Sequence, residues 1–169
     1  MPSQNNRTGR LAMRGMLVAV AMVLSWLEAQ LPVFFAVPGM KMGLTNLVVL
    51  IALYRFGKKD AMIINILRIL LVGLSFGNMF SMIYSLAGGL LSGIVMILLY
   101  ITNRFRMVSV SLAGGIFHNV GQILVAMFVL ESSSVLYYLP VLWISGMAAG
   151  VFVGLLGAQV VKRLPEQKD

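Results

Sequence analysis

The chain has 169 residues, of which 60% are hydrophobic and only 11% are charged. A water-soluble domain carries about a quarter charged residues, so this composition excludes an ordinary soluble fold and indicates an integral membrane protein. The net charge of +8 does not imply nucleic-acid binding, because the basic residues flank apolar segments, as membrane topology requires.

Six apolar segments predict an all-α polytopic membrane protein whose residues 1–169 form a single domain. A helix needs about 20 apolar residues to cross a bilayer. The second and third segments are shorter than this, so we expect them to extend into their flanking loops or to lie where the bilayer is thin. The predicted spans are about 11–31, 44–56, 61–74, 79–101, 107–130 and 137–161.

The first segment is long and lacks a convincing small-residue cleavage site, so we expect a retained helix and not a signal peptide. Glu28 lies near its far end. Gly15 and Ala19 are small residues four apart, which lets a neighbouring helix approach closely. They could dock a partner protein or pack within the bundle. The next stretch, 32–43, is apolar but broken by Pro and Gly, which predicts a cap lying on the membrane or dipping into it.

Arg68 is the most informative single residue. It lies about eight residues into the third segment, roughly 12 Å from the cytoplasmic end at 1.5 Å per residue, where snorkelling is difficult. A buried arginine needs a carboxylate, several carbonyls or an anionic ligand. Glu28 is the only acidic residue within a predicted span. Two interpretations stay open: a structural Arg68–Glu28 ion pair, or an Arg68 that binds an anionic group of a ligand.

The fifth segment contains a buried polar run at 114–122. His118 and Gln122 are four residues apart, and Asn119 and Gln122 are three apart, so all three share one helix face. Polar groups at this depth should point into the protein or into a wet cavity. They could form interhelical hydrogen bonds, but we favour a ligand-lining face, because three polar groups cluster where one or two would suffice for packing.

Polar residues at other helix ends could line the same cavity. Asn46 begins the second segment and could instead cap its helix. Glu28, Asn46, Asn78 and Gln122 fall toward the outer half of the protein, and Arg68 can reach it. This predicts a pocket open to the outside. The candidate ligand-binding residues are Glu28, Asn46, Arg68, Asn78, Tyr84, His118, Asn119 and Gln122.

The distribution of basic residues predicts the orientation in the membrane. With six spans, all but two of the 13 Lys and Arg residues fall on one side; Lys41 lies on the other side and Arg68 within a span. The positive-inside rule makes the basic side cytoplasmic. We therefore expect a multi-pass protein of the plasma membrane with both termini in the cytoplasm.

The sequence offers little for catalysis. It has no phosphate-binding loop with a lysine, so we expect no ATP hydrolysis within this chain. Asp60 and Asp169 are its only aspartates, too few for prenyl diphosphate chemistry on Mg²⁺. One histidine, no cysteine and few carboxylates fall short of the usual metal-ligand set. We expect no enzyme activity, no cofactor and no metal.

Four stretches together resemble the bacterial Gx transporter family, which is often labelled heptaprenyl diphosphate synthase component I. The resemblance covers residues 11–162, and its motifs lie at 41–50, at Arg68, at 80–92 and at 114–122. That family is in turn similar to the substrate-binding S components of energy-coupling factor (ECF) transporters.

The resemblance to S components implies six helices, cytoplasmic termini and a vitamin-like ligand bound near the outer face, under a loop between the first two helices. It also implies two ATPases and a separate membrane coupling protein, and this coupling protein docks through small residues of the first helix. Gly15 and Ala19 match that docking motif in part. The synthase label is hard to reconcile with the missing carboxylates, and we interpret it as a reflection of gene context.

The main hypothesis is therefore a substrate-binding subunit for uptake of a small molecule, energised by an ECF-type module. Its partners would be the lipid bilayer, the ligand, the coupling protein and the ATPases, with no nucleic acid. One alternative is a non-catalytic membrane component associated with heptaprenyl diphosphate or quinone synthesis. A weaker alternative is a self-sufficient small carrier or channel.

Overall fold

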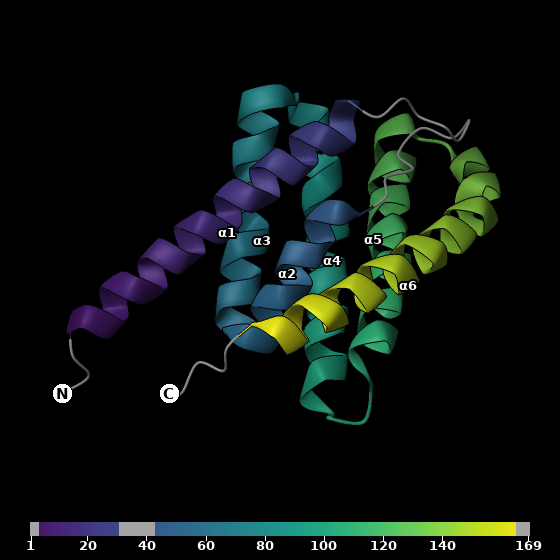
Figure 1. Cartoon of the computed structure of the whole chain (residues 1–169). Coiled ribbons are helices and arrows are strands. Elements are labelled where there is room, and N and C mark those ends of the chain that lie inside the picture. The colour runs from purple at the N-terminus through teal and green to yellow at the C-terminus, as the bar shows by residue number, and fades with distance from the viewer. Residues whose placement is uncertain (1–3, 31–42, 165–169) are drawn as a thin grey trace.

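The computed structural model describes residues 4–30 and 43–164, and all the regular secondary structure in these ranges is helical. Six α-helices and one short 3₁₀ helix make up the described part, which confirms the prediction of an all-α protein (Figure 1). The elements are α1 Gln4–Gln30, α2 Leu44–Arg55, α3 Lys58–Phe76, α4 Met79–Ile101, α5 Met107–Leu130, η1 Ser133–Tyr138 and α6 Leu139–Arg163. The predicted cap at 32–43 lies, apart from Gly43, outside the described residues.

Four of the described helices are long and apolar enough to cross a membrane, which makes this a membrane protein. They are Thr8–Glu28, Met79–Ile101, Met107–Leu130 and Ser133–Arg163. Helix α2 is apolar but has only 12 residues. Helix α3 has 19 residues but includes three charged residues in its first turn, and Arg68 further along. The count of six spans therefore stays a prediction.

Helix α3 is longer than the predicted span of 61–74 at both ends. It begins directly after Gly57, whose φ of 89° ends the preceding turn. Asp60 lies in its first turn, where a negative charge complements the helix dipole. At the other end, the gap of 75–78 between the predicted spans contracts to Gly77 and Asn78. The Asn78 side chain caps α4 by accepting a hydrogen bond from the backbone N–H of Ser81 at 2.7 Å.

Helix α2 forms the centre of the bundle and contacts α1, α3 and α6. Six successive residues, 48–53, are buried, none more than 9% exposed. A helix that is apolar all round is stable only where other elements surround it. This burial fixes α2 in the middle of the protein, and its first turn, with Thr45 and Asn46, faces the space between the surrounding helices.

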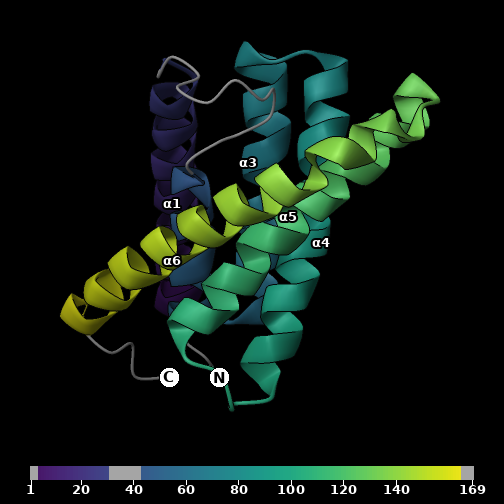
Figure 2. The ribbon, with the colours of Figure 1, turned by 90° about the vertical axis from the view of Figure 1, so that its right-hand side faces the viewer.

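Helix α5 lies so close to α4 and α6 that glycine is required at the crossings. A Cβ on Gly115 would lie 2.2 Å from the carbonyl oxygen of Gly146 in α6, and a Cβ on Gly121 would lie 2.7 Å from that of Ala87 in α4. Such backbone contacts are a common way for helices to associate in membranes. Figure 2 shows α6 crossing α5 obliquely, and this crossing brings Gly146 and Ala149 to the wall of a cavity.

Helix α1 is mostly exposed and is tied to the bundle by polar contacts near both ends. Near its start, Arg14 forms an ion pair with the buried carboxylate of Asp60 in α3, and Arg10 lies 3.8 Å from the same carboxylate. Near its end, Glu28 accepts hydrogen bonds from Gly43 and Thr45. These contacts fix the helix where apolar packing is sparse.

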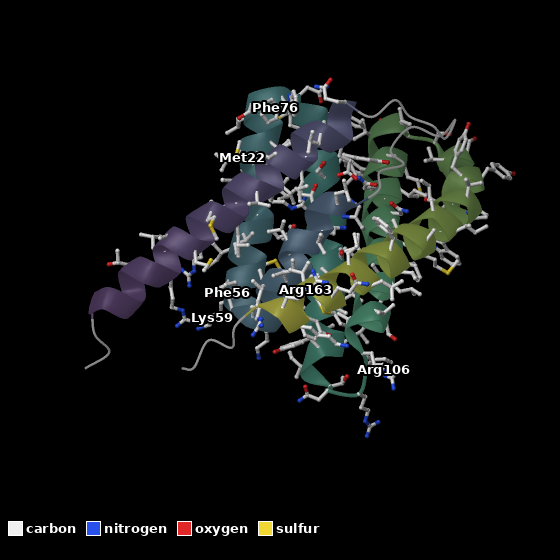
Figure 3. The ribbon with its side chains drawn as sticks, viewed as in Figure 1. Met22, Phe56, Lys59, Phe76, Arg106 and Arg163 are labelled. Atoms are coloured by element: carbon white, nitrogen blue, oxygen red, sulfur yellow. The ribbon has the colours of Figure 1, made fainter. Side chains whose placement is uncertain are left out.

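The two ends of the bundle differ in charge. Lys59, Arg106 and Arg163 lie at the same end as the start of α1 and the end of α6 (Figure 3). Phe76 lies at the opposite end, near the end of α1 that carries Glu28. The structure therefore separates a basic end from an end with few charges.

Candidate functional site

A cavity of about 170 Å³ opens between the helices at the end of the bundle away from the basic residues. A dry cavity of about 150 Å³ is large enough for a benzene molecule, so this cavity can hold a compact small molecule. Its wall combines apolar side chains from α3 and α4 with polar groups from five helices. The polar lining residues are Ser25, Glu28, Thr45, Asn46, Arg68, Ser81, Ser85, His118 and Asn119.

Arg68 is the cation of the cavity wall and is only 8% exposed. Its Nε and Nη2 donate to Oδ1 of Asn65 at 3.2 and 2.9 Å, and Nη2 also donates to Oδ1 of Asn46 at 3.0 Å. Asn65 is held in turn, because its Nδ2 donates to the carbonyl oxygen of Gly89 at 2.8 Å. Two neutral amides therefore orient the guanidinium without neutralising its charge. Neither N–H of its Nη1 has an acceptor among the described residues.

Glu28 supplies the carboxylate of the wall and does not form an ion pair with Arg68. Its Oε1 accepts the backbone N–H of Gly43 at 2.5 Å, and its Oε2 accepts the hydroxyl of Thr45 at 3.2 Å. These contacts cap the N-terminus of α2, where a negative charge is favourable. In the described part of the chain the carboxylate that forms ion pairs is that of Asp60. The direct Arg68–Glu28 pair, one of the two interpretations from sequence, is therefore not formed.

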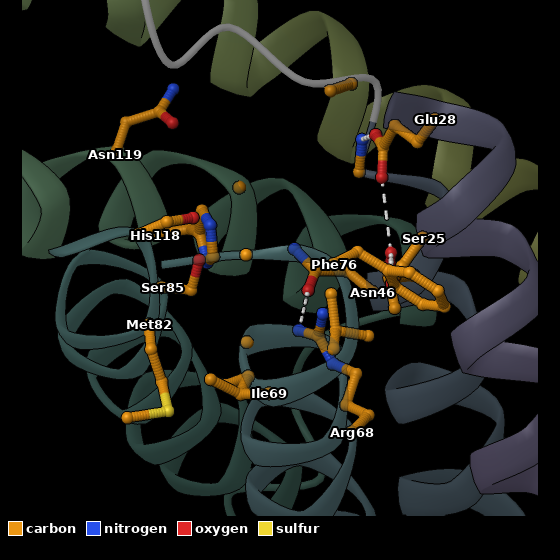
Figure 4. A pocket seen from close by; sticks show the side chains of 18 of the residues that line it. Ser25, Glu28, Asn46, Arg68, Ile69, Phe76, Met82, Ser85, His118 and Asn119 are labelled. Atoms are coloured by element: carbon orange, nitrogen blue, oxygen red, sulfur yellow. Dashed lines mark hydrogen bonds between the residues drawn. The ribbon is translucent and has the colours of Figure 1, made fainter. Parts of the chain in front are cut away.

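Only part of the polar face of α5 reaches the cavity. His118 and Asn119 line the cavity, and Figure 4 shows His118 beside Ser85. Asn119 also holds α5 to α6, because its Nδ2 donates to the carbonyl oxygen of Leu142 at 2.5 Å. Gln122, one turn further along α5, is 1% exposed and packs against Gly88 in α4. It does not line the cavity.

Two further candidates from the sequence, Tyr84 in α4 and Asn78 at its N-terminus, do not line the cavity. Ser81 and Ser85, four residues apart, face the cavity. Tyr84 shares a different face with Phe80, and their rings stack with centroids 5.9 Å apart. Asn78 is exposed and serves as the cap of α4. Of the eight residues singled out from sequence, the structure thus brings Glu28, Asn46, Arg68, His118 and Asn119 to one cavity.

Sequence reasoning missed the residues that position these groups. Asn65 lies three residues before Arg68, and Ser25 three residues before Glu28, so each shares a helix face with the charged residue that it accompanies. The hydroxyl of Ser25 lies 3.1 Å from that of Thr45. This spacing was a usable signal for both residues. The apolar part of the wall, which includes Ile69 and Met82, carried no signal of this kind.

A family model described as heptaprenyl diphosphate synthase component I matches residues 17–160. The chain belongs to this family. The matched range contains every residue that lines the cavity. No curated protein and no solved structure matches the chain. The family's name denotes one component of a synthase.

The chemistry of the cavity suits binding. It presents one guanidinium, one carboxylate and one imidazole together with amides and hydroxyls. Within the described ranges, no three His, Asp or Glu side chains come together in a way that could hold a metal ion. A cavity of this size is also far too small for a heptaprenyl chain. The arrangement can hold and orient a small polar molecule.

Proposed function

We propose that this member of the component I family is a non-catalytic membrane subunit that binds a small, vitamin-like polar molecule for uptake. The observation that carries the proposal is the cavity around Arg68, a buried cation that neutral amides orient and that forms no direct ion pair with a carboxylate of the described residues. Ionisable groups inside membrane proteins are expensive to bury and mark ligand or ion pathways by default.

The orientation follows from the charge asymmetry of the bundle. The basic end that carries Lys59, Arg106 and Arg163 is the cytoplasmic side by the positive-inside rule. Both termini are then cytoplasmic, and the cavity at the opposite end faces the outside of the cell. A solute would enter it without first crossing the membrane.

Uptake against a gradient needs an energy source outside this chain. We propose an ECF-type coupling protein with ATPases as the partner, docked on α1. Gly15 and Ala19 are exposed on this helix, and a Cβ on Gly15 would meet nothing within 4 Å. Apolar side chains flank them, including Met16 and Val20, which are 54% and 44% exposed. This surface lets another membrane helix approach closely.

The family name favours a second candidate function. As part of a heptaprenyl diphosphate synthase, the chain would hold a soluble prenyltransferase at the membrane. The cavity would then have no role in prenyl chemistry, because it is too small for the product. This candidate predicts a stable complex with the soluble enzyme and no retained small molecule.

Native mass spectrometry of the gently extracted protein separates the two candidates. We expect a small molecule bound to the wild-type chain, along with a membrane partner and ATPases. Arg68→Gln should lose the small molecule, whereas Arg106→Gln, which removes an exposed charge at the basic end, should retain it. A wild-type protein that carries no small molecule and co-purifies with a soluble prenyltransferase would contradict the uptake function.

A further inference from the structure

We infer that the cavity accepts a compact zwitterion, whose anionic group binds Arg68 and whose cationic group binds Glu28. This inference rests on the proposed function of the cavity as a ligand site and names the class of molecule that fits it. It arises from the presence of two opposite charges on one wall that form no direct ion pair with each other.

The first turn of α2 separates the two charges. The hydroxyl of Thr45 donates to Glu28, and the side-chain oxygen of the next residue, Asn46, accepts from Arg68. Figure 4 shows Asn46 between Glu28 and Arg68. Neighbouring residues thus keep the carboxylate and the guanidinium apart and fix both. A ligand that reaches both charges must carry its own two charges a short chain length apart.

Both groups retain capacity for a ligand. A guanidinium has five N–H donors, and the two on Nη1 of Arg68 are not used by any described residue. A carboxylate has about four acceptor positions, and Glu28 uses one on each oxygen for Gly43 and Thr45. Both side chains line the cavity, and no described residue uses these remaining positions.

The charge balance of the wall favours a zwitterion over a simple anion. A monovalent anion on Arg68 would offset the cation of the wall and leave Glu28 without a cationic partner among the described residues. A monovalent cation on Glu28 would leave Arg68 in the same state. Uncompensated buried charges are strongly unfavourable. A molecule with one charge of each sign compensates both and adds no net charge.

The size of the cavity limits the molecule to few atoms. About 170 Å³ slightly exceeds a cavity that holds benzene, which matches a short ω-amino acid. Useful probes are β-alanine, γ-aminobutyrate and δ-aminovalerate. Each has an alkanoate in which a methyl group replaces the ammonium, and an alkylamine of similar length that lacks the carboxylate.

The test measures thermal stabilisation and affinity for these probes with the full-length protein in lipid nanodiscs. We expect at least one amino acid to bind more tightly than its matched alkanoate and amine by about 10-fold or more. Hydrogen bonds to charged groups have contributions of that order.

Variants of the two charged residues should invert this selectivity. Glu28→Gln keeps an acceptor for Gly43 but removes the charge. It should lower the affinity for the amino acid by about 10- to 100-fold and leave the affinity for the alkanoate unchanged or higher. Arg68→Gln should lower the affinity for both the amino acid and the alkanoate. Glu131→Gln, which removes an exposed acidic residue at the end of α5, is the matched control and should change neither.

The outcomes separate this inference from the proposed function. An alkanoate or amine that binds the wild-type protein as well as its amino acid would overturn the inference and leave the uptake function standing. If no probe binds although native mass spectra show a retained small molecule, the inference is likewise overturned and the uptake function still stands. If no probe binds and no small molecule is retained, the proposed function itself fails.

Discussion

At the scale of single residues, the site depends on side chains that hold the charged groups as much as on the charged groups themselves. Asn65 is 2% exposed and joins α3 to α4, because it accepts from Arg68 twice and donates to Gly89 in α4. Its amide keeps the guanidinium directed at the cavity. A buried arginine without such acceptors would be strongly destabilising.

Replacing Asn65 by Ala should therefore lower the free energy of unfolding by about 2–3 kcal/mol, because hydrogen bonds to a buried charge are lost. Ser92→Ala is the contrasting variant. Ser92 is 1% exposed, and its hydroxyl has no hydrogen-bond partner among the described residues, so its removal should leave stability unchanged or raise it slightly. Denaturant titration in detergent measures both. Equal destabilisation by the two variants would contradict this account of Asn65.

At the scale of elements, close helix crossings position the cavity wall. The contact between Gly115 in α5 and Gly146 in α6 sets how near these helices lie, and both glycines line the cavity. Asn119, one turn after Gly115, joins the same two helices through the carbonyl oxygen of Leu142. Packing and hydrogen bonding thus fix this side of the site together.

Gly115→Ala should force α5 and α6 apart and destabilise the protein by about 1–3 kcal/mol, because its Cβ would lie 2.2 Å from the carbonyl oxygen of Gly146. Gly15→Ala in α1 is the control. Its Cβ would meet nothing within 4 Å, so a stability equal to that of the wild type, or up to about 1 kcal/mol higher, is expected from helix propensity. The melting temperature of each purified variant measures the change in stability. A Gly115→Ala protein as stable as the wild type would show that the crossing tolerates a wider spacing.

The elements also show how far sequence reasoning reaches. Hydropathy was sufficient for the helices, because long apolar segments such as 79–101 and 107–130 coincide with α4 and α5. Helix α3 was underestimated, because the charged residues at its start belong to the helix and interrupt the apolar signal. The spacing of His118, Asn119 and Gln122 predicted a shared face, but Asn119 contacts α6 and Gln122 packs against α4, so which residues line the cavity depends on where α4 and α6 cross α5. These crossings depend on tertiary packing, which the local periodicity of the sequence does not reveal.

At the scale of the whole molecule, one end is basic and the other holds a polar cavity. The charged residues that sequence reasoning paired, Arg68 and Glu28, do lie on the same cavity wall. The choice between a direct pair and separate roles could not be made from sequence, because it depends on Asn46 and Thr45 in the first turn of α2. Their placement follows from the burial of α2 at the centre of the bundle.

The central claim is that this cavity is open to the outside of the cell, and thiol labelling tests it most directly. The chain has no cysteine, so single cysteines can be introduced without background. In intact cells, a membrane-impermeant thiol reagent should label Ser85→Cys in the cavity wall and Glu131→Cys at the end of α5. It should not label Arg104→Cys in the turn between α4 and α5, at the basic end of the bundle. Labelling of Arg104→Cys in intact cells, with Ser85→Cys reacting only after the cytoplasmic side is exposed, would contradict the claim.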